Sequence, residues 1–511
     1  MQFVKGGPRV PNSLLDAHEE GRVILFCGAG ISCAAGLPGF GGLVNEIYTA
    51  LGIDQTSIEE SAYKSGRYDS VLHLLEQRYH DGRLGVRTPL VEILKPRLRR
   101  KEATRTHQAL LQLGRTREGV LRLVTTNFDR IFERLKTREK IAAPTYSAPL
   151  LPIPKDSRWD GIVYLHGLLP DRVDKAALKR LVLTSGDFGL AYLTERWAAR
   201  FVSELFRNYI ICFVGYGIND PVMRYMMDAL AADRHLGEPG SQAYAFGVCE
   251  TGQEANQAAA AWEAKGVTPI LYHAGPDGAG KHSSLHDTLE NWAAAYRYGI
   301  QGKERIVAEH AMTRPTASTA EDDFVGRMLW ALSDKSGVPA KQFADLNPAP
   351  SLEWLKVLSE PCFDSQDLGR FGVPAAEKRR GESAFSLLSR PPPYTQSLAM
   401  SVVSTGGSSG WDAGMYHLAR WLVRHLNDPE LLLWVIEQGG VLDNRFARLI
   451  EDQLRQLAKW KAEGSTERLV AARLYAPNAV PGPQMQVLWQ ILLGGLVRSQ
   501  QPGPNFLSWV E

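Results

Sequence analysis

Polar side chains follow several short apolar runs in the first half of this sequence. Asn127 and Asp129 come just after the run Val120–Thr126, and His166 follows the run Ile162–Leu165. An amide, a carboxylate and an imidazole can together orient water, stabilise positive charge and accept protons. Each is an ordinary residue at a strand end, but their joint occurrence predicts one polar site.

Glycines dominate the segment CGAGISCAAGLPGFGG at residues 27–42, which follows the apolar run Arg22–Cys27. A strand that ends in Gly-x-Gly and opens into a helix offers free backbone N–H groups to a pyrophosphate. We therefore expect Gly28 and Gly30 to let the backbone approach a ligand, and Ser32 to donate to a phosphate oxygen. The spacing differs from the dinucleotide fingerprint G-x-G-x-x-G, so this segment alone is equally consistent with a tight turn that binds nothing.

A second glycine pair closes the apolar run Tyr209–Val214, in the sequence GYGIND. It consists of Gly215 and Gly217, and Asn219 and Asp220 follow at the expected start of a helix. Ligands of open α/β sheets bind outside the carboxyl ends of the strands. Four strand ends that carry glycine, amide, carboxylate and imidazole groups therefore form one consistent constellation.

The elements that must position these residues are those of a layered α/β domain, because short β-type runs alternate with helical patterns up to about residue 300. Several runs are apolar throughout, as in strands covered on both faces, so we predict a Rossmann-like, mostly parallel sheet. A mostly helical insertion separates the first two runs, at about residues 42–113. The predicted strands are Arg22–Cys27, Val120–Thr126, Ile162–Leu165, Leu181–Leu183, Tyr209–Val214, Ala243–Val248 and Val267–Tyr272.

The composition of the sequence changes at residues 311–323, which are mostly small, polar or charged. We expect a linker there, between an α/β domain at residues 1–310 and an all-helical region at residues 324–511. Seven of the twelve Trp lie beyond residue 350, so the second region should pack a core of its own. The last residues carry no closing signal, which leaves open whether the chain is a fragment of a longer one.

Charge and cysteine content exclude several classes of protein. The chain has 511 residues, and 58 Lys and Arg against 56 Asp and Glu give a net charge of +2, so no global field favours nucleic acid. Five widely spaced Cys without a CxxC motif argue against a disulfide framework or a zinc ribbon. No run reaches the ~18 apolar residues of a membrane span, and we expect a cytoplasmic protein. His282 and His286 stand four residues apart without a third ligand, which favours a helix start over a metal site.

In combination and order, the motifs GAGIS, GLPGF, TTNFD, LHG and GYGIND resemble those of sirtuins, over roughly residues 20–300. The resemblance implies that the site binds NAD+ and that His166 is the catalytic base. The catalytic residues that it implies are Asn127, Asp129 and His166. The NAD+-binding residues that it implies are Gly28, Ala29, Gly30, Ser32, Phe40, Thr126, Gly215, Gly217, Asn219 and Asp220, with Gly215, Gly217 and Asn219 on the adenosine side.

Two departures separate this sequence from protein-deacylating sirtuins. Those proteins hold a structural zinc with two Cys pairs between the His and the later glycine loop, whereas residues 167–209 contain no Cys. Their loop reads Pro-Asp-Phe-Arg where this chain has Pro38-Gly39-Phe40-Gly41. The pattern is closer to the bacterial defence-associated sirtuins, which cleave NAD+ and usually join this core to a helical region that senses infection or mediates assembly.

The resemblance therefore implies an NAD+ hydrolase that releases nicotinamide and ADP-ribose without a metal, in antiphage defence by NAD+ depletion. Asn127 would orient water or the ribose hydroxyls, a neutral His166 would accept a proton, and Asp129 would engage the carboxamide or stabilise the developing cation. A zinc-less NAD-dependent protein deacylase and a non-catalytic module that binds NAD+ or ADP-ribose remain alternatives. We also expect regulation by the C-terminal region, an even-numbered homo-oligomer and a phage-derived or companion protein as trigger, with no membrane or nucleic-acid partner indicated.

Overall fold

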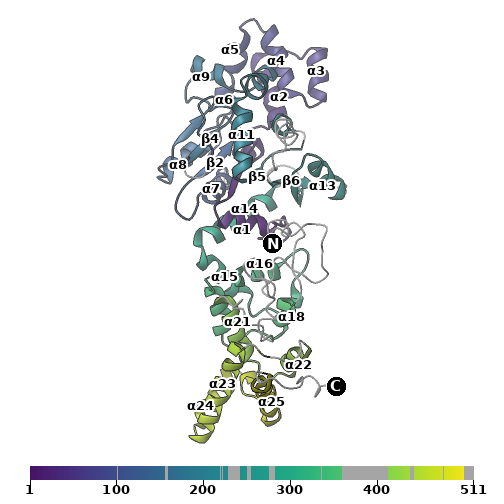
Figure 1. Cartoon of the computed structure of the whole chain (residues 1–511). Helices are drawn as coiled ribbons and strands as arrows, with labels where there is room; N and C mark the ends of the chain where they lie inside the picture. Colours follow the sequence, from purple (N-terminus) through teal and green to yellow (C-terminus); the bar gives the residue numbers. More distant parts are fainter. Residues whose placement is uncertain are drawn as a thin grey trace. The chain divides into compact units, whose positions relative to one another are not determined.

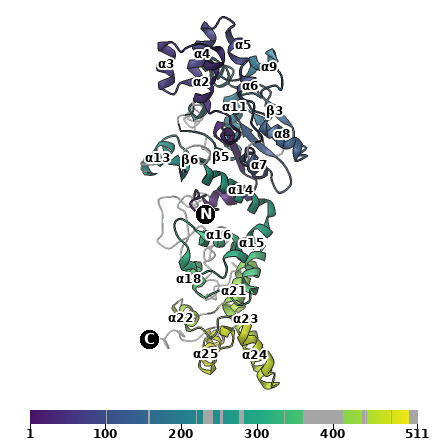
Figure 2. The ribbon, with the colours of Figure 1, turned by 180° about the vertical axis from the view of Figure 1, so that it is seen from behind.

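The computed structural model describes most of the chain, and the description below is confined to those residues. It shows two compact units, which we call the α/β unit (residues 6–10 and 14–297) and the helical unit (residues 1–5, 11–13 and 298–511). The two units are described separately (Figures 1 and 2). The described residues are 1–99, 102–155, 159–218, 220, 222–227, 242–249, 255–275, 282–334, 336–359, 413–437, 442, 444–475 and 477–499.

A seven-stranded sheet forms the centre of the α/β unit, in the order β3-β4-β2-β1-β5-β6-β7. Every neighbouring pair is parallel, which confirms the predicted Rossmann-like sheet. Because β1 lies between β2 and β5, the chain first builds one half of the sheet and then the other, so a topological switch point adjoins β1. The strands are β1 (Val23–Cys27), β2 (Arg122–Thr125), β3 (Thr145–Ser147), β4 (Gly161–Tyr164), β5 (Ile210–Val214), β6 (Ala243–Cys249) and β7 (Thr268–His273).

The continuous apolar runs of the sequence form strands whose two faces are both covered by other parts of the unit. All of β1 is buried, and its Ile24 and Phe26 share a core with Val202 and Leu205 of α11 (Trp197–Asn208). The remaining helices and helical turns of the unit are α1 (Asn12–Glu19), η1 (Ala29–Ala35), α2 (Phe40–Leu51), α3 (Ser57–Lys64), α4 (Tyr68–Arg78), α5 (Gly82–Arg87), α6 (Leu90–Ile93), α7 (Arg105–Leu113), α8 (Ile131–Arg138), α9 (Lys175–Arg180), α10 (Ser185–Phe188), η2 (Gly189–Thr194), α13 (Ala255–Glu263) and α14 (Ser283–Tyr298).

Two strand predictions were wrong. Leu181–Leu183 is not a strand but the connection between α9 and α10. Its side chains are apolar because they lie in two different hydrophobic clusters, while its backbone reaches the sheet region through the Val182 N–H to the His166 carbonyl (2.9 Å). The edge strand β3 was missed because Thr145–Ser147 is short, polar and only partly buried.

The segment between β1 and β2 is helical, as expected, and carries α2 to α7. Figures 1 and 2 both show α2 to α5 gathered on one side of the unit. These helices have a hydrophobic cluster of their own, which also takes in three leucines from the α9–α10 region. Members of this cluster include Leu43, Val44, Ile47, Leu72, Leu75, Leu178, Leu181 and Leu183.

The helical unit contains no strand among its described residues. Its core includes the fully buried Trp354, Trp421 and Trp489, as the clustering of Trp in this region predicted. None of the described helices is both long and apolar enough to cross a membrane. The elements are α15 (Ile300–His310), η3 (Pro315–Ala317), α16 (Phe324–Leu332), α17 (Val338–Asp345), α18 (Glu353–Ser359), α21 (Ala413–Val423), α22 (Pro429–Glu437), α23 (Asn444–Ala462), α24 (Thr466–Tyr475), η4 (Pro477–Ala479) and α25 (Pro483–Ser499).

The division between the units falls at Arg297–Tyr298, whereas the sequence analysis expected a linker at residues 311–323. Val307 of α15 and the following Ala311 lie in the same hydrophobic cluster as Phe324 of α16. The polar segment therefore connects two helices of one core, which its composition alone does not reveal.

Candidate active site

The two glycine loops that follow β1 and β5 pack directly against each other. The Gly28 N–H donates to the Val214 carbonyl (2.8 Å), and the Gly30 N–H donates to the Gly215 carbonyl (2.9 Å). A Cβ atom at Gly30 would lie 2.9 Å from the Gly215 oxygen, and Gly215 itself has a φ of 78°. The bare backbone at these positions is thus required by contact between the loops.

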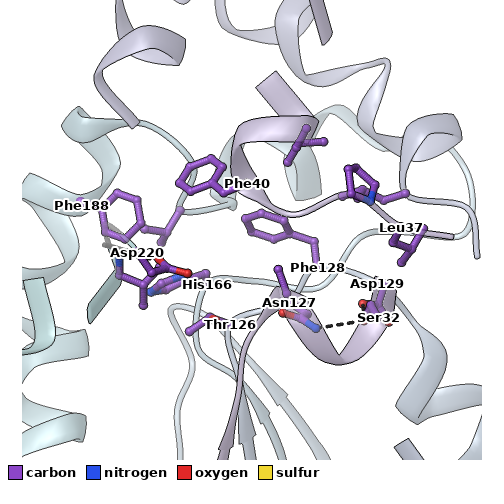
Figure 3. A pocket seen from close by; sticks show the side chains of 16 residues that line it. Ser32, Leu37, Phe40, Thr126, Asn127, Phe128, Asp129, His166, Phe188 and Asp220 are labelled. Atoms are coloured by element: carbon purple, nitrogen blue, oxygen red, sulfur yellow. Dashed lines mark hydrogen bonds between the residues drawn. The ribbon is translucent and has the colours of Figure 1, made fainter. Parts of the chain in front are cut away.

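A cavity with about 600 Å³ of empty space lies at the carboxyl ends of β1, β2 and β4 (Figure 3). The cavity brings together all three residues predicted for the reacting end and several predicted to bind the cofactor. The predicted residues that line it are Ala29, Ser32, Phe40, Thr126, Asn127, Asp129, His166 and Asp220.

A second cavity, with about 750 Å³ of empty space, lies beyond η1 and next to β5, β6 and β7. Gly30, Gly215 and Gly217 line it, and the last two are residues that the resemblance assigns to the adenosine side. Gly28 lines neither cavity and is buried between the two glycine loops. Asn219 lies outside the described residues.

Ser32 is the centre of a buried hydrogen-bond cluster in the first cavity. Its hydroxyl donates to Asp129 Oδ2 (2.8 Å), accepts from Asn127 Nδ2 (3.1 Å) and contacts His107 Nε2 (3.2 Å). A serine hydroxyl has one hydrogen and two lone pairs, so His107 must donate and Ser32 has no hydrogen left for a phosphate. Asn127 Nδ2 also donates to the Gly28 carbonyl (3.2 Å), which leaves the amide oxygen as the free end of this side chain.

His107 is a member of this cluster that the sequence analysis did not single out. It comes from α7 and is fully buried, and burial lowers its pKa to about 4, although Asp129 opposes this shift. Asp129 uses its other oxygen, Oδ1, to accept the Ile131 N–H (3.0 Å) at the start of α8. Both carboxylate oxygens of Asp129 therefore have partners within the protein.

His166 follows β4 and is 2% exposed. Its Nε2 lies 2.9 Å from the Tyr192 hydroxyl, and its ring meets Phe188 edge to face at 5.1 Å. Burial lowers the pKa of His166 to about 3, against the opposing charge of Asp187. The imidazole is therefore neutral at physiological pH, but it is a weaker base than an ordinary histidine.

Asp220 lies beside His166, with a carboxylate oxygen directed into the cavity, whereas Ser32 and Asp129 lie at the opposite end (Figure 3). Its Oδ1 accepts the Val222 N–H (2.9 Å). Burial raises the pKa of Asp220 to about 6, although this N–H and Lys265 act in the opposite direction. Sequence analysis placed Asp220 among the cofactor-binding residues, and the structure brings it into the first cavity beside His166.

Thr126 and the histidines of the second cavity have partners within the protein. Thr126 Oγ1 lies 2.7 Å from the Tyr216 hydroxyl. His282 Nδ1 lies 2.9 Å from the Tyr272 hydroxyl, and His286 Nδ1 lies 2.6 Å from Thr106 Oγ1. In the part of the chain that the structure describes, no group of three or more His, Cys, Asp or Glu side chains could hold a metal ion.

Comparison with known proteins agrees with this arrangement. Residues 121–270 match the SIR2-like domain, and this stretch contains β2, β4, β5 and β6 together with Asn127, Asp129 and His166. The chain is also 33% identical over 335 residues to the uncharacterized protein y4cA of Sinorhizobium fredii (strain NBRC 101917 / NGR234). That match covers 65% of this chain but 27% of the relative, so this chain spans about a quarter of the relative's length. The α/β unit is thus similar to SIR2-like domains over residues 121–270.

Proposed function

We propose that the α/β unit hydrolyses NAD+ to nicotinamide and ADP-ribose. The match to the SIR2-like domain supports NAD+ as the substrate. The observation that carries hydrolysis is the cavity in which the amide of Asn127, the neutral His166 and the carboxylate of Asp220 converge. Two cavities on either side of η1 also suit a ligand with two nucleoside ends.

The leaving group needs little help in this reaction, because the nicotinamide of NAD+ already carries a positive charge. The bond between C1′ and the nicotinamide nitrogen breaks, the bonding electrons leave with neutral nicotinamide, and the ribose becomes oxocarbenium-like. Water then attacks C1′ and loses one proton. The residues must therefore hold the ribose, stabilise the positive charge and direct the water.

Each polar residue has a part in this scheme that its contacts support. The free oxygen of Asn127 accepts a hydrogen bond from water or a ribose hydroxyl, because its nitrogen is held by Ser32 and Gly28. Above about pH 6, the Asp220 carboxylate stabilises the cation and takes up the proton. His166 acts as a neutral hydrogen-bonding partner of the ribose.

We further propose that this hydrolysis serves antiphage defence in the cytoplasm through NAD+ depletion, and that the helical unit controls it. The support for control is a separate helical core in the same chain as the SIR2-like domain. In this proposal the chain works as an even-numbered homo-oligomer, and a phage-derived or companion protein triggers it. Light scattering of the full chain tests the assembly, and NAD+ measured in infected cells tests the defence role.

Incubation of the purified chain with NAD+, with and without an acetylated peptide, tests the activity. Chromatography should show nicotinamide and ADP-ribose without the peptide, and Asn127→Ala and His166→Ala should each lose turnover. Asn208→Ala is the matched control for the amide and His80→Ala for the imidazole, because both side chains are exposed. Turnover near the wild-type rate in both cavity variants would refute the assignment. Release of nicotinamide that requires the peptide would support the deacylase, and binding of NAD+ without turnover would support the binding module.

A further inference from the structure

Three aromatic rings stack at the His166 end of the first cavity, and we call Phe188, Tyr192 and Tyr225 the aromatic wall. Phe188 and Tyr225 are almost parallel, with ring centroids 4.7 Å apart and an interplanar angle of 4°. Tyr192 stacks on the same pair at 6.0 Å from Tyr225 and 6.1 Å from Phe188. Phe188 and Tyr192 are 1% and 2% exposed, whereas Tyr225 is partly buried.

The aromatic wall borders the space in which an acceptor would meet the substrate. Phe188 lines the cavity together with His166 and Asp220, and Figure 3 shows its ring next to both residues. Tyr192 holds the His166 ring through the contact between its hydroxyl and Nε2. A nucleophile that reacts beside His166 and Asp220 must therefore fit beside the Phe188 ring.

The helical segment between β1 and β2 holds the wall in place from one side through Asp69 of α4. The Tyr225 hydroxyl donates to Asp69 Oδ2 (2.9 Å), and the Arg224 guanidinium lies 3.5 Å from the same oxygen. Asp69 is fully buried. The position of the Tyr225 ring thus depends on a carboxylate that a distant part of the chain supplies.

The same helical segment holds Phe188 through its neighbour Asp187. The Asp187 carboxylate pairs with Arg87 and Arg83 of α5 and accepts the N–H groups of Leu183 (3.0 Å) and Thr184 (2.9 Å). Arg87 is fully buried and also pairs with Glu76 of α4 (2.6 Å). Because these groups are buried and connected, Phe188 has little freedom to move aside.

We propose that the aromatic wall selects the acceptor of the reaction, by leaving room for water beside His166 and excluding larger nucleophiles such as an acyl-lysine side chain. This inference rests on the proposed hydrolysis of NAD+. It assigns a role to α4 and α5, which fix the wall although none of their described residues lines the first cavity. Phe188 is the specificity-determining residue, and Tyr225 positions it.

Competition between water and a small alcohol measures how strictly the site selects its acceptor. With water, the water oxygen bonds to C1′ as neutral nicotinamide leaves, one proton is lost, and the product is ADP-ribose. With methanol, the methanol oxygen forms the same bond, its hydroxyl proton is lost, and the product is the methyl glycoside of ADP-ribose. Both products follow cleavage of the same bond, so their ratio at a given methanol concentration reports the space for the acceptor.

The experiment incubates the full chain with NAD+ and increasing methanol and measures both products by chromatography and mass spectrometry. A single methyl group changes selection in an apolar pocket by roughly tenfold or more, so Phe188→Ala should raise the proportion of methyl glycoside by about that factor. Tyr225→Leu should raise it in the same direction, because the ring that supports Phe188 is lost. Leu193→Ala is the matched control on the same segment, since Leu193 is 68% exposed and does not line the first cavity. Its product ratio should equal that of the wild type.

The outcomes separate this inference from the proposed function. An unchanged ratio in both wall variants, with nicotinamide still released, overturns the role of the aromatic wall and leaves NAD+ hydrolysis intact. A wild-type chain that releases no nicotinamide either as the purified protein or in infected cells overturns the proposed function, and this inference falls with it. Far-UV circular dichroism establishes folding, and Tyr225→Leu decides the question if Phe188→Ala does not fold.

Discussion

Replacing Ser32 with alanine removes the one hydroxyl that connects three buried side chains of the reacting end. Its oxygen lies 2.8 Å from Asp129 Oδ2, 3.1 Å from Asn127 Nδ2 and 3.2 Å from His107 Nε2. Ser32 is 2% exposed, so bulk water does not take its place. Ser32→Ala should therefore disturb the positions of Asn127 and Asp129.

The expected loss of kcat depends on which side chains keep a hydrogen-bond partner in Ser32→Ala. Asn127 Nδ2 retains the Gly28 carbonyl, whereas Asp129 Oδ2 and the His107 ring lose the hydroxyl. A hydrogen bond to a charged group contributes about 1.5–3 kcal/mol. If that stabilisation is lost in the transition state, kcat should fall roughly 10- to 150-fold.

Initial rates of nicotinamide release over a range of NAD+ concentrations measure this effect. The structure predicts a fall in kcat with little change in KM, because the Ser32 hydrogen goes to Asp129 and not to the substrate. Cys33→Ala, the exposed neighbour on the same helical turn, should behave as the wild type. A higher KM with unchanged kcat in Ser32→Ala would instead show that the hydroxyl binds a phosphate of NAD+, and would refute this reasoning.

Buried ionisable groups give two more predictions. Burial raises the pKa of Asp220 to about 6 and lowers that of His166 to about 3, so kcat/KM should fall as the pH drops through 6, and Asp220→Asn should abolish this inflection. An inflection that persists in Asp220→Asn contradicts this assignment. Arg87→Met should cost about 3 kcal/mol, because Asp187 and Glu76 lose a buried cation, and hydrogen exchange at residues 178–188 should accelerate roughly 100-fold. Burial raises the pKa of Asp187, but Arg87, backbone N–H groups and Arg83 outweigh burial and hold that pKa below its usual value. The stabilisation from these ion pairs is therefore complete at neutral pH and disappears as the pH falls through the lowered pKa. Equal exchange in Arg87→Met and wild type would show that the ion pairs contribute nothing locally.

The sheet could be predicted because its strands are local patterns. β1 and β5 are continuous apolar runs, and strands covered on both faces have that appearance. The same pattern misled at Leu181–Leu183, since a buried connection between two hydrophobic clusters is equally apolar. β3 escaped notice because a short edge strand needs no apolar side chains.

The sequence pattern did not predict why the first loop requires glycine at these positions. Their spacing indicated close approach to a ligand, and the structure shows that Gly28 and Gly30 closely approach the backbone at Gly215. A glycine in such a pattern indicates that some other group lies close to the backbone. Which group that is depends on the fold. The aromatic wall was missed for the same reason, because Phe188 and Tyr225 meet only after folding.

The sequence by itself determined the parallel sheet and the strand ends that carry the polar groups, because apolar periodicity and the residues that follow a strand are properties of short segments. Only the tertiary structure decided what those groups contact. It directs the Ser32 hydrogen to Asp129, brings Asp220 beside His166 and sets Phe188 next to both at that end of the cavity. These contacts join residues far apart in the chain, and burial, which sets their pKa values, exists only once the layers have packed.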